Sequence, residues 1–173
     1  MTPGDLGLFI LRLVVGLTMA AHGAQKAFGW WKGPGWAGSY AVMARMGFRP
    51  ANFWGVVSIG AELVGGLLLA AGLLTPFAAM ALVGQSVVIA LKAHLARGFW
   101  GRDGGFEFPL SLAAGVVALV GTGPGSASLD AALGLSYSAE LRGLLMAVGV
   151  LGVLGAIAIS RVLPAGGPTE APR

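Results

Sequence analysis

Glu62 is a carboxylate near the middle of an apolar stretch, where it must be protonated, paired or hydrated. Arg12 lies at a comparable depth in the first apolar stretch, so the two are predicted to form a buried ion pair. His22 and Lys26 share a helical face with Arg12, and that face is expected to turn toward Glu62. Two interpretations stay open. The pair fixes the register of two helices, or these groups handle protons or bind a polar headgroup.

A second group of polar side chains is expected at one boundary of the apolar segments. His22 and Lys26 end the first segment, His94 lies near the end of the third, and Glu107 begins the fourth. A polar headgroup needs hydrogen-bond donors or acid–base groups beside an apolar channel. We therefore predict a headgroup site formed by His22, Lys26, Glu62 and Glu107. His94 is more typical of an interfacial histidine, and no metal site is predicted, because HxxxH and HExxH spacings are absent.

The elements that position these residues must lie in lipid. Of the 173 residues, 56% are hydrophobic and only 10% are charged, whereas a soluble domain carries about 25% charged residues. A helix needs about 20 residues to cross the hydrocarbon core. The sequence therefore predicts an all-α, polytopic transmembrane helical bundle. Its expected spans are Leu6–Ala24, Phe53–Leu74, Pro76–Ala96, Phe108–Gly121 and Ala139–Ser160.

The distribution of positive charge predicts the orientation of this bundle. If the loop Gln25–Asn52 is cytoplasmic, most lysines and arginines lie on that side, and only Arg142 falls on the opposite side. Under the positive-inside rule, the N-terminus is outside and the C-terminus inside, in the inner (cytoplasmic) membrane of a bacterium. All five tryptophans fall at the same inner boundary. Ser39–Phe48 is expected to form a short interfacial helix there.

Composition also excludes several classes of function. The chain has no cysteine, which excludes a disulfide, a CxxC redox pair, a cysteine nucleophile and a cysteine-ligated iron–sulfur cluster within it. The positive charges form no basic stripe, so no nucleic-acid partner is expected. Residues 164–173 are rich in proline and glycine and are predicted to be disordered.

Three ordered blocks of the sequence resemble the DoxX family of small bacterial and archaeal membrane proteins. The first runs from Leu11-Arg12-Leu13 through Gly16 to His22-Gly23-Ala24-Gln25-Lys26. The second is Ala61-Glu62-Leu63-Val64-Gly65-Gly66 followed by Gly72-Leu73-Leu74-Thr75. The third comprises Glu107-Phe108-Pro109-Leu110 and the loop from Gly123-Pro124-Gly125 to Ser128-Leu129-Asp130. The resemblance covers residues 7–135.

The resemblance implies a DoxX-like four-helix membrane domain over residues 1–135. Residues 136–162 would add a C-terminal transmembrane helix, and residues 163–173 a disordered tail. It also implies a redox setting. The related DoxD proteins form a subunit of thiosulfate:quinone oxidoreductase, and other DoxX relatives associate with enzymes of thiol and superoxide stress.

The leading hypothesis is an integral membrane subunit of a redox-associated complex, either quinone-linked or linked to oxidative stress. A quinone is its expected cofactor, bound at the headgroup site of His22, Lys26, Glu62 and Glu107. The subunit is not expected to be catalytic by itself. The expected partners are the lipid bilayer, a soluble or membrane redox protein and a second copy of this chain. One alternative is a non-catalytic scaffold for a partner enzyme, favoured by the absence of cysteine and cofactor motifs. Another is a small transporter or proton pathway, supported by the intramembrane charges but not by any inverted repeat.

Overall fold

The computed structural model describes residues 2–162, which form helices and loops but no strand. Four helical segments are long and apolar enough to cross a membrane: Pro3–Phe28, Ala51–Ala71, Thr75–Arg97 and Ala139–Arg161. The predicted all-α membrane bundle, with its C-terminal membrane helix, is confirmed. The tail 163–173, predicted to be disordered, lies outside the described residues. In chain order the elements are α1 (Pro3–Phe28), η1 (Trp30–Lys32), α2 (Gly35–Arg45), α3 (Ala51–Ala71), α4 (Thr75–Ile89), η2 (Ala90–His94), η3 (Leu95–Arg97), η4 (Gly101–Asp103), α5 (Glu107–Thr122), α6 (Leu129–Ala132) and α7 (Ala139–Val162).

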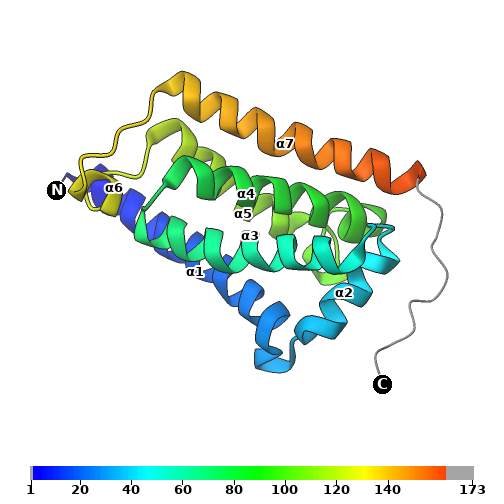
Figure 1. The fold of residues 1–173 in the computed structure, drawn as a ribbon. Coiled ribbons are helices and arrows are strands. Elements are labelled where there is room, and N and C mark those ends of the chain that lie inside the picture. Colours follow the sequence, from blue (N-terminus) through cyan, green and yellow to red (C-terminus); the bar gives the residue numbers. More distant parts are fainter. Residues whose placement is uncertain (1, 163–173) are drawn as a thin grey trace.

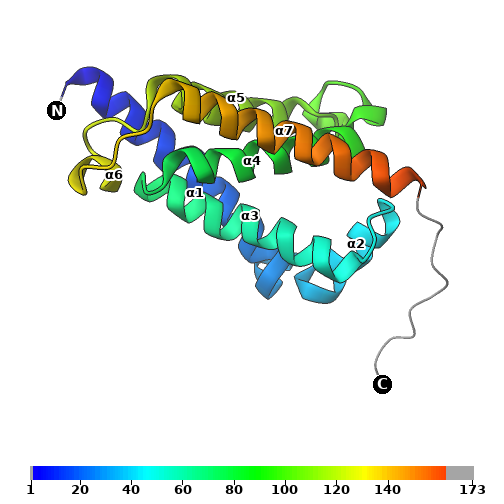
Figure 2. The ribbon, with the colours of Figure 1, turned by 45° about the horizontal axis from the view of Figure 1, so that its top comes forward.

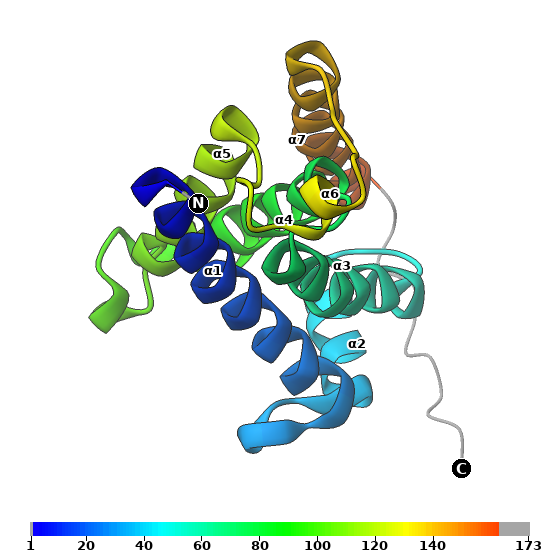
Figure 3. The same ribbon diagram turned by 90° about the vertical axis from the view of Figure 1, so that its left-hand side faces the viewer.

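The long helices run between two ends of an elongated bundle, in alternating directions (Figure 1). One end carries the start of α1 and the short helix α6. The other, which we call the tryptophan end, carries α2, the starts of α3 and α5, and the end of α7. Helix α4 lies at the centre and packs against α3, α5 and α7 (Figures 2 and 3). Side chains on α4 can therefore meet groups from several other helices.

Helices α1 and α3 cross at a contact made by small residues. A methyl group added at Gly16 would lie 2.5 Å from the Ala70 backbone nitrogen, and one added at Gly66 would lie 2.5 Å from that of Ala20. Only glycine allows two helix backbones to approach this closely, as is common between membrane helices. This contact aligns the two antiparallel helices along their length and so decides which of their polar groups meet.

Helix α5 is the shortest of the apolar helical segments that run the length of the bundle, since the segment that begins with α4 continues to Arg97. Its 16 residues extend about 24 Å at 1.5 Å per residue, against about 30 Å for the hydrocarbon core. The predicted span Phe108–Gly121 agrees with it to one residue at each end. The third predicted span, Pro76–Ala96, likewise agrees with the apolar segment Thr75–Arg97 to one residue at each end, but this segment is not one regular helix. Its regular α-helix ends at Ile89, and the chain continues through the π-helical turn η2 and the turn η3.

The predicted interfacial helix Ser39–Phe48 is replaced by α2, which covers Gly35–Arg45. Phe48 follows α2 and is only 2% exposed, packed in an apolar cluster with Met43 and Ile157. Because this ring fills space beneath α7, the end of the segment belongs to the bundle core and not to the headgroup zone. The segment between α1 and α3 thus closes one side of the bundle.

Candidate functional site

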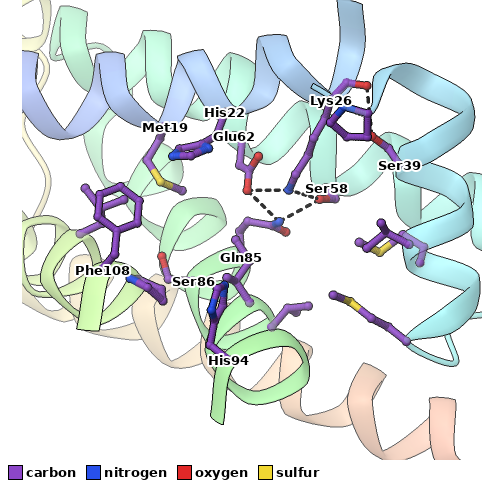
Figure 4. Close-up of a pocket in the computed structure, with 18 residues that line it drawn as sticks. Met19, His22, Lys26, Ser39, Ser58, Glu62, Gln85, Ser86, His94 and Phe108 are labelled. Carbon is purple, nitrogen blue, oxygen red and sulfur yellow. Dashed lines mark hydrogen bonds and ion pairs between the residues drawn. The ribbon is translucent and has the colours of Figure 1, made fainter. Parts of the chain in front are cut away.

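A cavity of about 300 Å³ opens between α1, α2, α3, α4 and α5 near the tryptophan end. Its walls are mostly apolar, and its polar side chains come from α1, α2, α3, α4 and η2 (Figure 4). Three of the four residues predicted for the headgroup site line it: His22, Lys26 and Glu62. An apolar pocket with a few convergent polar groups is the usual form of a small-molecule site.

A buried ion pair with two further polar groups forms one wall of the cavity. The Lys26 ammonium lies 2.7 Å from Glu62 Oε1 and donates to Ser58 Oγ at 3.0 Å. The Gln85 amide nitrogen donates to the same two oxygens, at 3.0 Å to Glu62 Oε1 and 2.8 Å to Ser58 Oγ. The cluster therefore joins α1, α3 and α4 through a single carboxylate oxygen and a single hydroxyl.

The other carboxylate oxygen of Glu62 is buried and has no hydrogen-bond partner among the described residues. Glu62 itself is 1% exposed. A buried carboxylate oxygen without a partner is costly, since it has lost its hydration and gained no donor in return. The Glu62 carboxylate is therefore held in place through Oε1 alone.

His22 projects from α1, one turn before Lys26, and its ring meets that of Phe108 edge-on with 5.7 Å between centroids. The Phe108 ring covers one side of the imidazole, and the ring nitrogens have no bond to another described residue. His22 thus offers the cavity a neutral or cationic hydrogen-bonding group.

His94 reaches the cavity from η2, and its Nδ1 lies 2.6 Å from the Gly104 carbonyl oxygen. The sequence favoured an ordinary interfacial histidine at this position. The structure instead places His94 among the lining residues, on the side of the cavity formed by α4 (Figure 4).

Glu107, the fourth predicted site residue, does not line the cavity. It begins α5, and its Oε2 accepts a hydrogen bond from the Gly101 backbone nitrogen at 2.8 Å. Its carboxylate is therefore turned toward the loop that precedes α5. The sequence placed Glu107 at the correct end of the bundle, but the backbone of that loop captures its side chain.

The predicted Arg12–Glu62 ion pair is wrong. Arg12 is fully buried and donates to the carbonyl oxygens of Ala70 and Ala127, while Glu62 is paired with Lys26. Arg12 and Lys26 are separated by 14 residues, which correspond to about 21 Å along a helix. The glycine contact places Glu62 at the Lys26 end of that length. A helical wheel gives the face on which a residue lies but not its level along the helix axis. It therefore cannot distinguish Arg12 from Lys26 as the partner of Glu62.

Arg12 instead belongs to a polar cluster at the opposite end of the bundle. Its guanidinium lies at the C-terminus of α3, where exposed carbonyl oxygens favour a cation. Beside it, Asp130 is fully buried and accepts from the backbone nitrogens of Leu74 at 2.8 Å and Thr75 at 3.0 Å. Burial and then the Asp130 carboxylate raise the pKa of Tyr137, whose hydroxyl donates to Asp130. This cluster closes the turn between α3 and α4.

Sequence reasoning missed two members of the cavity cluster, Ser58 and Gln85. The sequence contained a signal that could have identified each of them. Ser58 precedes Glu62 by four residues and so shares its helical face, and Gln85 is an amide in the middle of an apolar stretch. A polar side chain at that depth needs a partner, and the unexplained Glu62 was available.

The cluster suits an organic ligand better than a metal ion. Within residues 2–162, no group of three or more histidine, aspartate or glutamate side chains is placed to hold a metal. A quinone fits, because its flat ring needs apolar walls and its two oxygens need hydrogen-bonding groups. Lys26 and His22 supply such groups on this cavity.

Comparison with known proteins gives a match to the model of the DoxX family over residues 7–95. A protein named as an uncharacterized membrane protein of Mycobacterium tuberculosis is 33% identical over 138 residues, which cover 73% of this chain and 81% of that relative. No solved structure matches the chain. The family match includes Arg12, the whole cavity cluster and His94, and it ends before α5.

Proposed function

Because this chain belongs to the DoxX family of membrane proteins, we propose that it is the quinone-binding membrane subunit of a redox complex. The chain is a multi-pass membrane protein, so a lipid-soluble cofactor reaches it by diffusion within the bilayer. The observation that carries the proposal is the cavity, where the Lys26–Glu62 ion pair and His22 lie among apolar walls.

Each polar residue of the cavity has a distinct role in this proposal. Lys26 donates a hydrogen bond to a headgroup oxygen, and Glu62 holds Lys26 in place. Gln85 and Ser58 fix the carboxylate. A bound quinone would supply two-electron redox chemistry. In this proposal the electrons are exchanged with a partner protein of the complex.

The direct test is binding of a short-chain quinone, decyl-ubiquinone, to the protein in lipid nanodiscs. His22→Phe should weaken binding about tenfold, the loss expected for one hydrogen bond of about 1.4 kcal/mol. Glu62→Gln should weaken it too, because a neutral amide no longer holds the Lys26 ammonium by charge. Glu140→Gln is the matched control. It makes the same carboxylate-to-amide change on an exposed residue at the far end of the bundle, and it should leave binding unchanged.

Two outcomes would contradict the proposal. Wild-type protein that fails to bind decyl-ubiquinone and a naphthoquinone analogue would leave a non-catalytic scaffold as the better explanation. Equal losses in Glu62→Gln and Glu140→Gln would show that binding occurs elsewhere on the protein.

A further inference from the structure

The turn that carries His94 departs from regular helix. After Ile89 the chain of α4 widens into the π-helical turn η2, which spans Ala90–His94. A π-helical turn changes the direction of the side chains that follow it and is often found at functional sites. Here the last residue of the turn is a histidine that lines the cavity.

The hydrogen bond of His94 determines which ring nitrogen carries the proton. A carbonyl oxygen can only accept, so Nδ1 must be the donor in its 2.6 Å contact with Gly104. In the neutral ring, Nε2 is then an unprotonated acceptor. No described residue donates a hydrogen bond to Nε2.

The loop that supplies this carbonyl is itself held in place. Its backbone closes through bonds from Phe106 to Gly98 at 3.1 Å and from Glu107 to Phe99 at 2.9 Å. The Glu107 carboxylate accepts from Gly101 at 2.8 Å. Glu107 thus does not contact the cavity itself. It holds the loop that presents the Gly104 carbonyl oxygen to His94.

Taken with the proposed function, on which this inference rests, these contacts point to the redox form of the ligand. We propose that His94 Nε2 accepts a hydrogen bond from a ligand hydroxyl, that the cavity therefore prefers a hydroquinone to a quinone, and that Glu107 is the positioning residue for His94. A free acceptor matches a ring that carries a hydroxyl group, whereas a quinone carbonyl has no hydrogen to give.

The tautomer is measured without any ligand. The chain contains two histidines, so ¹⁵N-labelled histidine gives two imidazole spectra, and a His22→Phe sample assigns them. At pH 8, His94 should show a protonated Nδ1 and an unprotonated Nε2. Glu107→Ala should release the loop and mix the tautomers, while Glu107→Gln, which keeps an acceptor for Gly101, should restore the wild-type spectrum. A protonated Nε2 in the wild-type protein would overturn the inference.

Ligand preference is measured with the two redox forms of decyl-ubiquinone under anaerobic conditions. His94→Phe should weaken binding of the hydroquinone about tenfold, the effect of one lost hydrogen bond, and should change quinone binding much less. Glu107→Ala should act in the same direction, with recovery in Glu107→Gln. If wild-type protein binds both forms and His94→Phe leaves their ratio unchanged, this inference fails and the proposed function stands. If wild-type protein binds neither form, both fail.

Discussion

Glu62 and Arg12 are both buried in the membrane bundle, and each is satisfied in a different way. Glu62 shares its Oε1 between Lys26 and Gln85, whereas Arg12 donates to backbone carbonyl oxygens at the other end. Removing one member of a buried pair strands the other and costs about 3–5 kcal/mol. Lys26 is 21% exposed, so we expect a value at the lower end of that range.

A double-mutant cycle tests the Lys26–Glu62 pair. Lys26→Met and Glu62→Ala should each destabilise the protein, and the double variant should lose less than the sum of the two, with a coupling of about 1–3 kcal/mol. Glu62→Gln should be milder than Glu62→Ala, because the amide oxygen still accepts from Lys26 and Gln85. The measurement is the free energy of unfolding in mixed detergent micelles.

Arg12→Ala is the matched control for this cycle. It removes another buried cation from the same helix but shares no partner with Glu62. Its effect should add to that of Glu62→Ala within about 0.5 kcal/mol. Strong coupling of Glu62 to Arg12, with none to Lys26, would contradict the geometry of the cavity.

At the level of elements, the contact between α1 and α3 decides the alignment of the site. Gly66 and Gly16 meet backbone atoms of the opposite helix, so an added methyl group must push the helices apart. Gly23, three residues before Lys26, lies against Leu63, the neighbour of Glu62. Movement at this contact would therefore separate Lys26 from its carboxylate.

Gly66→Ala should consequently destabilise the protein by about 1–3 kcal/mol, the usual cost of overpacking, and should weaken quinone binding. Gly60→Ala provides the control on the same helix, since a methyl group there meets nothing within 4 Å. It should be neutral or stabilise α3 by up to about 1 kcal/mol, because alanine is the better helix former. Thermal unfolding of both variants in detergent is the measurement. Equal losses would show that the helices do not meet at Gly66.

For the whole molecule, the structure shows which helix ends lie together at each end of the bundle. The positive charges indicate which end faces the cytoplasm. The start of α3 and the end of α7 lie at the same end of the bundle (Figure 1). Lys26, Lys32, Arg45 and Arg49 lie at this end too, near the exposed rings of Trp30 and other tryptophans. Lysine and arginine concentrate on the cytoplasmic side of a membrane. We therefore propose that the tryptophan end is cytoplasmic and the N-terminus external.

Reporter fusions test this orientation. Fusions after Asn52 and after Arg161 should both report the cytoplasm, and a fusion in the loop 126–136 should report the outside. Opposite locations for the first two would mean that α7 does not cross the membrane. Both locations outside would reverse the bundle and place the cavity near the external surface.

The division of the chain into a four-helix domain and an added helix stays a prediction. Helix α7 packs mainly on α4, and little of its surface is buried within residues 2–162. The family match, however, stops at residue 95, before both α5 and α7. Residue 135 is therefore a boundary drawn from the resemblance, and removal of residues 136–173 would test whether the rest folds.

The sequence by itself determined the fold class, the spans and the end of the bundle where the polar site lies. These properties depend on composition and on runs of apolar residues, which are local along the chain. It also identified Glu62, His22 and Lys26, because charged or polar groups at membrane depth are conspicuous against an apolar background.

Only the tertiary structure decided the partners. The partner of Glu62 depends on the axial register of α1 against α3. That register is set by the contact between Gly16 and Gly66, which are far apart in the sequence. The hydrogen bond of Glu107 depends on a loop backbone, and the position of His94 depends on a π-helical turn. Neither feature produces a periodic pattern in the sequence. Hydrogen bonds form between specific atoms within about 3 Å, whereas sequence spacing places a side chain only to a helical face. Pairing within the cavity was therefore a property of the folded bundle alone.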